Sequence, residues 1–299
     1  MRFNRLVIGL IIAAVSGFLY FSNTQVNPVT GEKQRVAMTP DQEVALGIQS
    51  APQMAEQFGG VLPNSAIQAY VKEVGRRVAN SSNAKDSPYR FDFHVLSDPQ
   101  TVNAFALPGG QIFITAALLK RLQNEAQLAG VLGHEVGHVI GRHSAEHMAK
   151  AQLTQGLVGA AGVAGSGDGG GQTAAMIANM VGSMVNMRFG RADELESDIL
   201  GVRYMLDAGY DPRALKDVMR ILAESRSGSP QPEFLSTHPD PGNRTQRIDD
   251  EIAKVFANGV PSNLSLGDRG TFRRSRPRFD ITLSLVLTPN KKPRSSGVF

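Results

Sequence analysis

A histidine, a glutamate and a second histidine in the middle of the chain have the spacing of a metal site. His134, Glu135 and His138 form the pattern H-E-x-x-H. Residues four apart share one face of a helix, so both imidazoles can reach one cation while the glutamate reaches a water molecule on it. Zinc with three protein ligands lowers the pKa of such a water to about 7. The pattern predicts His134 and His138 as zinc ligands and Glu135 as the base; two histidines buried in a core are the alternative.

The same stretch of chain contains a second pattern that competes for the metal. His143, Glu146 and His147 read as the inverted motif H-x-x-E-H. Both patterns cannot serve one ion. In a continuous helix His143 is turned away from the face that His138 shares with His134. We therefore expect His143 and His147 to support the ligands or to lie at the surface.

The third zinc ligand has to be a histidine or a carboxylate, because the chain has no cysteine. Four carboxylates follow on one predicted helix: Asp193, Glu194, Glu196 and Asp198. The expected buried stripe of this helix consists of Leu195, Ile199, Val202 and Leu206. Glu194 and Asp198 lie on one flank of the stripe and Glu196 on the other. The pair four apart favours Glu194 as ligand and Asp198 as acceptor of a hydrogen bond from a ligating histidine. Spacing leaves open which flank faces the metal, and a solvated acidic face is the alternative.

One more histidine lies in a position to act at the site. His238 stands between Thr237 and Pro239, at the end of a predicted loop. It could stabilise the oxyanion that forms when water attacks a peptide carbonyl, or it could bind zinc in a closed, inactive state. A purely structural role at a helix start is equally compatible, because proline favours the first position of a helix.

Four segments together resemble a known family of zinc metallopeptidases. They are residues 103–110, 134–138 with 142–143, 191–201, and 237–239 with 247–248. On these residues the chain resembles the gluzincin family that includes the CAAX prenyl endopeptidase, the HtpX-like proteases and the BepA-like periplasmic proteases. The resemblance spans about residues 40 to 255.

The resemblance implies roles for individual residues. Glu194 matches the third zinc ligand of the family, and Asp198 matches an aspartate that assists catalysis. Residues 103–114 match the edge against which substrate is laid. The first residues of that edge are Asn103, Ala104 and Phe105. One zinc ion per chain is the cofactor that the resemblance implies.

The elements that must position these residues follow from apolar periodicity. Helices are expected at about residues 39–58, 64–78, 124–150, 191–208 and 244–256, with one more after Asp211-Pro212. Strands are expected at about residues 91–95, 102–107 and 111–115, the last two joined as a hairpin, with a further edge strand at 281–287. The prediction is an α+β fold: a mainly helical, zincin-like metalloprotease domain with a small antiparallel sheet beside the H-E-x-x-H helix.

A glycine-rich stretch interrupts this pattern. Residues 156–171 are rich in Gly and Ala and precede an apolar run at 176–187. Because glycine makes a fixed helix costly, we expect a mobile loop followed by a short helix. A tolerated surface insertion and a gating or membrane-touching role are both open.

The amino terminus has the features of an export signal. Arg2 and Arg5 precede the uncharged apolar run of residues 6–21. Its length lies between a signal-peptide core and a spanning helix. We favour an uncleaved anchor in the cytoplasmic membrane, with the basic end in the cytoplasm and the rest at the periplasmic face. Cleavage after Ser16 or Gly17 would instead release the protein into the periplasm.

Composition sets the remaining limits. Without cysteine there can be no disulfide and no thiol nucleophile. The net charge is only +4, and no nucleic-acid recognition motif accompanies the basic residues near the carboxyl end, so no nucleic-acid partner is expected. The expected organisation is a signal or anchor at 1–22, a linker at 23–38, a peptidase domain at 39–258 and a basic, flexible tail at 259–299.

Together these features predict a zinc metalloendopeptidase that acts on unfolded or mis-assembled envelope proteins, whose extended segments can pair with a sheet edge. Two other functions stay open. One is an envelope chaperone or assembly factor with weak proteolysis and a largely structural zinc. The other is a hydrolase of a non-peptide envelope substrate.

Overall fold

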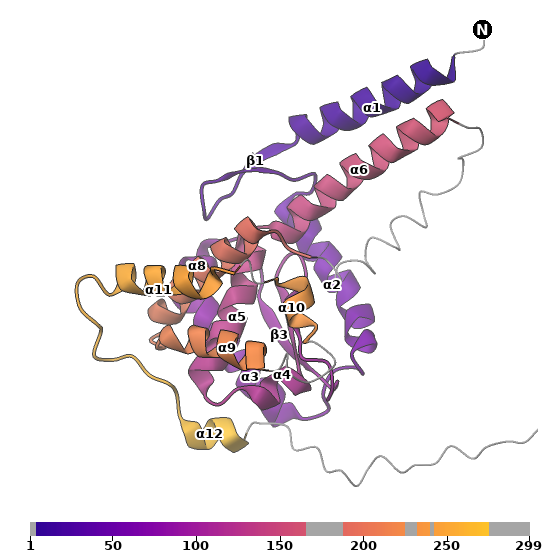
Figure 1. The fold of residues 1–299 in the computed structure, drawn as a ribbon. Coiled ribbons are helices and arrows are strands. Elements are labelled where there is room, and N and C mark those ends of the chain that lie inside the picture. Colours follow the sequence, from indigo (N-terminus) through magenta and orange to yellow (C-terminus); the bar gives the residue numbers. More distant parts are fainter. Residues whose placement is uncertain (1–3, 166–187, 225–231, 240–241, 275–299) are drawn as a thin grey trace, which may run out of the picture.

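A helical body surrounds a small sheet, and two helices project from it (Figure 1). The computed structural model describes residues 4–165, 188–224, 232–239 and 242–274. The helices are α1 (Arg5–Ser22), α2 (Pro40–Gln57), α3 (Ser65–Ser81), the 3-10 helix η1 (Asn83–Asp86), α4 (Ala116–Arg121), α5 (Glu125–Ile140), α6 (His143–Gly165), α8 (Arg191–Asp207), α9 (Arg213–Glu224), α10 (Phe234–Thr237), α11 (Arg244–Val255) and α12 (Arg269–Arg274). The helix expected at 176–187 and the strand expected at 281–287 lie outside the described residues.

The central sheet has three strands and is mixed. Strand β5 (Gln111–Thr115) lies between β3 (Asp92–Leu96) and β4 (Ala104–Ala106). The predicted β4–β5 hairpin is confirmed, with Gly109 and Gly110 at positive φ in its turn. The α+β fold class is confirmed too, but β3 pairs with β5 in parallel, so the sheet is not wholly antiparallel as expected. β5 takes the centre because it is apolar on both faces, which leaves the short β4 at an edge.

Helices cover both faces of the sheet. Helices α3 and α5 pack on the face that carries Phe93, Ile112 and Ile114, and together they form the main core. The opposite face carries Phe105 and Phe113, which form a second apolar cluster with residues of α2. The two apolar sets lie on opposite faces because alternate residues of a strand point to opposite sides of the sheet. Helix α5 is held against one of these faces.

Side-chain caps start three of these helices where the sequence predicts. Thr39 forms a capping box with Gln42 at the start of α2. Asn64 and Asn124 cap α3 and α5 by accepting hydrogen bonds from backbone amides three residues on. Each cap satisfies an amide that the helix itself leaves without a partner.

The helix expected over residues 124–150 is two helices, because the chain breaks at Gly141-Arg142. Arg142 has a φ of 55°, the left-handed conformation that is unfavourable for a residue with a side chain. This turn sends its guanidinium into the interior, where it donates to the Glu43 carboxylate and to the Met38 carbonyl. Both ionic side chains are buried. The periodicity of the sequence does not reveal a break that is fixed by an ion pair to α2.

This ion pair leads to a stability prediction. Arg142→Ala should lower the free energy of unfolding by about 3–5 kcal/mol, because it leaves Glu43 as a buried charge without its partner. Lys216→Ala is the control: it removes an exposed pair with Asp249 and should cost no more than about 1 kcal/mol. Urea unfolding measures both, and equal midpoints for the two variants would show that the buried pair does not hold the turn.

The expected linker is structured in part. Strands β1 (Thr24–Val26) and β2 (Lys33–Arg35) form a hairpin. Asn27 donates to the carbonyl of Ile140 at 2.6 Å, and Gln34 donates to the carbonyl of Gly141. The hairpin therefore attaches the amino-terminal segment to the domain at the end of α5.

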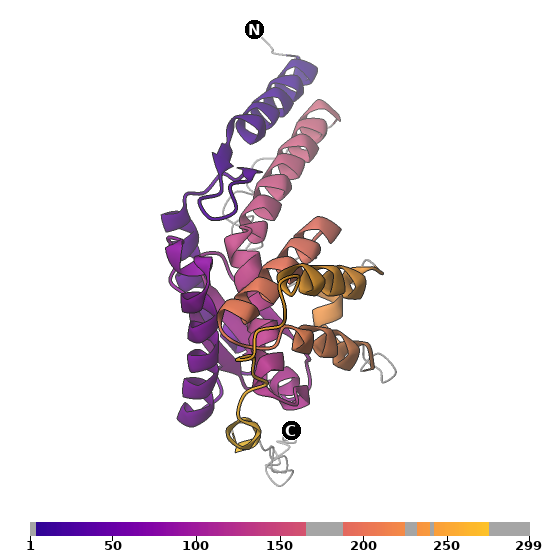
Figure 2. The same cartoon turned by 90° about the vertical axis from the view of Figure 1, so that its left-hand side faces the viewer.

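Helices α1 and α6 lie side by side and extend away from the body in both views (Figures 1 and 2). Within the described chain α1 is the one helix long and apolar enough to cross a membrane, a property that signal sequences share. Residues 156–165 are part of α6 and not of the expected loop. Among their glycines, Gly156 meets Ser16 of α1, where a side chain would not fit, whereas Gly159 and Gly162 have open space beside them.

Packing also continues past residue 258, where the sequence suggested a flexible tail. Tyr210 forms a bridge with Ser265, and Phe272 of α12 is fully buried beside Tyr70. The core therefore includes residues beyond the expected boundary. A single aromatic residue in a basic stretch gives no periodicity from which this could be predicted.

Candidate metal centre

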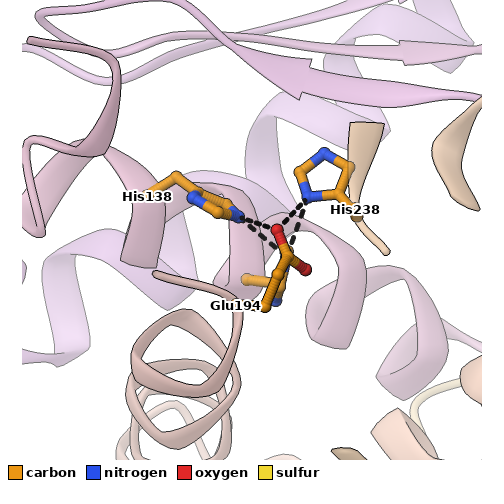
Figure 3. Close-up of side chains that lie close together, drawn as sticks. His138, Glu194 and His238 are labelled. Atoms are coloured by element: carbon orange, nitrogen blue, oxygen red, sulfur yellow. Dashed lines mark hydrogen bonds and ion pairs between the residues drawn. The ribbon is translucent and has the colours of Figure 1, made fainter. Parts of the chain in front are cut away.

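Three segments that are far apart in the sequence meet at one buried point. Helix α5 contributes His134, Glu135 and His138, and α8 contributes Glu194. His238 follows the short helix α10 and completes the group. Figure 3 shows His138, Glu194 and His238 directed toward one another.

Small residues allow α5 and α8 to approach closely enough for this. A Cβ atom on Gly137 would lie 3.0 Å from the backbone of Ser197, and one on Gly201 would lie 3.2 Å from the amide nitrogen of His134. The buried face of α8 therefore carries Glu194 and Asp198 as well as the small residues. The stripe expected to be buried is only partly so: Val202 is buried, but Leu195, Ile199 and Leu206 are half-buried. A face that contacts polar ligands does not follow the usual apolar pattern.

Four side-chain donors form a compact cluster. One ligand atom each from His134, His138, Glu194 and His238 lies within 4.8 Å of the others. Nε2 of His134 is 3.0 Å from Nε2 of His138, and Nδ1 of His238 is 3.0 Å from Oε1 of Glu194. The Glu194 carboxylate is also 3.4 Å from Nε2 of His138. Three imidazole nitrogens and one carboxylate are donors that zinc favours.

The charges at the cluster suit a cation. Burial lowers the pKa of His138 well below its usual value, so its imidazole is neutral and has a lone pair to donate. Burial alone would raise the pKa of Glu194, but the charge of His238, hydrogen bonds from His138 and His238, and Arg244 hold it well below its usual range. A neutral imidazole and an ionised carboxylate are the protonation states that metal binding requires.

Glu135 lies beside the cluster but is not part of it. Its carboxylate is fully buried, and neither oxygen has a hydrogen-bond partner within the part of the chain that is described. Oε1 is 3.7 Å from Nε2 of His238. Burial raises the pKa of Glu135. A buried acceptor without a protein donor is costly, so the arrangement fits a group that accepts from a bound water or substrate.

Asp198 and Arg244 support the cluster from behind. Asp198 Oδ1 is 2.9 Å from Nδ1 of His134, which fixes the orientation of that ring. Burial would raise the pKa of Asp198, but the Arg244 guanidinium, which donates two hydrogen bonds to its carboxylate, lowers it. Arg244 also lies 2.9 Å from Oε2 of Glu194. No sequence pattern singles out this arginine, because it is simply the first residue of α11.

The inverted motif does not converge on a second site. Because the chain turns at Arg142, the His143 side chain does not point away from His138 as expected. Its Nδ1 lies 2.9 Å from Nδ1 of His138. Its other nitrogen is 3.2 Å from Glu196. His147 pairs instead with Asp193 at 2.7 Å. His143 therefore orients His138, and Glu196 lies outside the donor cluster.

Two aromatic rings that the sequence did not single out cover the histidines. Phe189 stacks on His138 with the ring centres 4.1 Å apart, and Phe234 stacks on His238 at 4.3 Å. Both rings are buried. They keep water from the backs of the imidazoles, which strengthens the electrostatic interactions within the cluster.

The segment expected to hold substrate forms one edge of the sheet beside α5. Ala104 and Phe105 begin β4, and no other strand in the described ranges pairs with the free side of β4. Ala106 and His138 line the same small cavity, so this edge lies next to the cluster. Asn103 is buried before the strand, and its side-chain amide donates to Glu233 at 3.1 Å. Its side chain therefore fixes the strand. Ala104 and Phe105 are themselves buried, and what remains for a ligand is the backbone side of β4 that pairs with no described strand.

Comparison with known proteins agrees with this geometry. Residues 65–252 match the family described as Peptidase family M48. A beta-barrel assembly-enhancing protease of Yersinia pestis is 31% identical over 223 residues, which are 73% of this chain and 45% of that protein. The mitochondrial metalloendopeptidase OMA1 of Schizosaccharomyces pombe is 31% identical over 253 residues, 83% of this chain and 72% of that protein.

A third relative, the human mitochondrial metalloendopeptidase OMA1, is 28% identical over 251 residues, which are 79% of this chain and 47% of that protein. The chain thus spans less than half the length of the Yersinia and human relatives. The family match covers α3 through most of α11, and all four donor residues lie inside it.

Proposed function

Because the chain belongs to Peptidase family M48, we propose that it is a zinc-dependent endopeptidase with one zinc ion held by His134, His138 and Glu194. The observation that carries this proposal is the buried donor cluster with the Glu135 carboxylate beside it, whose oxygens have no hydrogen-bond partner among the described residues. Zinc bound there supplies a Lewis acid that lowers the pKa of a coordinated water to about 7.

Each residue around the cluster then has a defined task. Glu135 accepts the proton of the attacking water and delivers it to the leaving amine. Asp198, held by Arg244, accepts a hydrogen bond from Nδ1 of His134 and thereby directs Nε2 of that ring toward the cluster. Asp198 acts through fixed hydrogen bonds, so it does not have to reorient during the reaction.

His238 distinguishes a resting from an active arrangement. Its Nδ1 lies within the donor cluster, so that four protein groups surround one point. Four protein ligands are typical of structural zinc sites, whereas catalytic sites keep one position for water. His238 therefore has to withdraw before hydrolysis. After withdrawing, the imidazole would donate to the oxyanion of the attacked carbonyl.

The substrates we propose are extended segments of unfolded or mis-assembled envelope proteins. The edge of β4 that pairs with no strand in the described residues can add such a segment as a further strand, starting at Ala104 and Phe105. The Yersinia relative is a beta-barrel assembly-enhancing protease, and the Schizosaccharomyces pombe relative is a mitochondrial metalloendopeptidase. Helix α1 would hold the domain at the periplasmic face of the cytoplasmic membrane.

One observation favours the second function, an envelope chaperone or assembly factor with a largely structural zinc. The four donors are all buried, and four protein ligands are what a structural zinc site has. If His238 never leaves, the site stabilises the fold and β4 merely holds clients. This function predicts binding of unfolded proteins without cleavage.

Cleavage of casein, an unfolded protein, separates the two functions. We expect the purified protein to cut casein, to lose this activity in a chelator, and to regain it when zinc is restored. A compact, stably folded protein should resist cleavage, because its segments cannot extend along β4. Binding of casein with no cleavage at any zinc concentration would favour the chaperone and contradict the peptidase.

A further inference from the structure

Helices α1 and α6 expose large apolar side chains far from the peptidase site. Among the large apolar residues most exposed in the described chain are Phe18 and Leu10 of α1 and Val158 of α6, at 72%, 69% and 67%. Soluble surfaces rarely expose apolar residues in adjoining groups. Helices α1 and α6 lie together and away from the body (Figure 2). Their outward faces therefore form one apolar surface.

The two helices are fitted to each other by small residues. A Cβ atom on Gly9 would lie only 2.7 Å from the carbonyl oxygen of Ala160, and Ala164 is close to the same point. Nearer the body, Gly156 is packed against Ser16 with no room for a side chain. Close backbone approach through small residues is how helices associate in lipid, where there is no hydrophobic drive for association.

The composition of α6 changes where it runs beside α1. Lys150 is its last charged residue, and residues 156–165 contain only Gly, Ala, Leu and Val. Leu157 and Val158 point outward, whereas Ala160 faces α1. This stretch rises about 15 Å along the helix axis, roughly half of a hydrocarbon core of about 30 Å.

An arginine and two aromatic residues at one end of the apolar surface are typical of a membrane–water interface. At the end of α1 nearer the body, the Arg35 guanidinium lies over the rings of Tyr20 and Phe21, at 5.6 and 5.1 Å from their centres. Tyrosine and arginine are common at the level of lipid headgroups. On the other side of this boundary both helices carry apolar side chains outward.

From these contacts we infer that residues 156–165 of α6 are embedded in the bilayer beside α1, so that the protein is held by a pair of helices. The inference rests on the proposed anchorage of α1. The occupant of the apolar face is the lipid acyl region, because the face is continuous with α1 and has no charge. A paired insertion fixes the orientation of the domain, since α6 continues directly from the turn at Arg142 that follows the zinc helix.

The absence of tryptophan from the chain makes a direct test possible. Single substitutions Leu10→Trp, Val158→Trp and Ile48→Trp place one fluorophore on α1, on α6 and on α2. All three positions are helical and exposed, and Ile48 is 57% exposed on the domain. The full chain is reconstituted in vesicles of phosphatidylethanolamine and phosphatidylglycerol with brominated acyl chains. Casein cleavage by each variant, and Leu157→Trp as a second position on α6, guard against misfolding.

The inference predicts that Leu10→Trp and Val158→Trp lose most of their emission to the brominated chains, while Ile48→Trp keeps it. If only Leu10→Trp is quenched, α1 is anchored but α6 faces water, another protein or a second copy, and the inference is overturned. If neither Leu10→Trp nor Val158→Trp is quenched, the anchorage of α1 fails and the inference fails with it. The peptidase activity is read separately and does not depend on either result.

Discussion

Glu135→Gln should abolish casein cleavage while leaving zinc bound. Glutamine has nearly the same shape as glutamate and fits the same buried position, but it cannot accept the proton of the attacking water. Loss of a general base typically costs roughly 10²–10⁴-fold in rate. Zinc content and the urea midpoint of unfolding should scarcely change, because Glu135 has no hydrogen-bond partner in the described structure that the substitution could break.

The His147→Ala variant is a matched control for this result. His147 belongs to the competing motif but pairs with Asp193 away from the cluster. It should cleave casein at close to the wild-type rate. A Glu135→Gln protein that cleaves as fast as His147→Ala, in a preparation free of other proteases, would refute the assignment of the base.

The second large effect concerns the third ligand. Glu194→Gln and Glu194→Ala should lose the zinc that the wild-type protein binds at about one ion per chain, because only the imidazoles of His134, His138 and His238 then remain and the cluster has lost its carboxylate. Glu196→Ala should keep it, since Glu196 contacts His143 and lies outside the donor cluster. The zinc affinity of Asp198→Asn should lie between those of the Glu194 variants and Glu196→Ala, reduced about 10–100-fold, because Asp198 only orients His134.

Metal content after dialysis against a weak chelator measures this series, with circular dichroism to confirm that each variant is folded. The glutamine variant matters because it preserves volume beside Arg244, where alanine would leave a cavity. Retention of zinc by both Glu194 variants together with its loss from Glu196→Ala would mean that the other flank of α8 faces the metal.

Much of the site follows from local sequence patterns. The i and i+4 spacing of His134 and His138 is a property of any helix, and it needs no knowledge of the fold. The same holds for Glu194 and Asp198. The helix starts at Thr39, Asn64 and Asn124 were equally predictable, because capping is decided by a few neighbouring residues.

What the sequence could not supply depends on contacts between distant segments. Apolar periodicity does not identify the buried side of α8, because its close contact with α5 uses Ser197 and Gly201, which carry no apolar signal. The break after α5 depends on Arg142 meeting Glu43 of α2. Arg244 belongs to a helix that otherwise reads as an ordinary amphipathic surface helix. In each case the deciding partner is more than 40 residues away in the chain.

Anomalous X-ray scattering at the zinc absorption edge, from crystals of the purified protein, tests the central claim most directly. We predict one zinc peak about 2.0–2.2 Å from Nε2 of His134, Nε2 of His138 and a carboxylate oxygen of Glu194. Glu135 should lie close to the peak but not in bonding contact with it. A zinc peak bound by His143 and His147, or no peak at the α5–α8 contact in zinc-loaded crystals, would contradict the account.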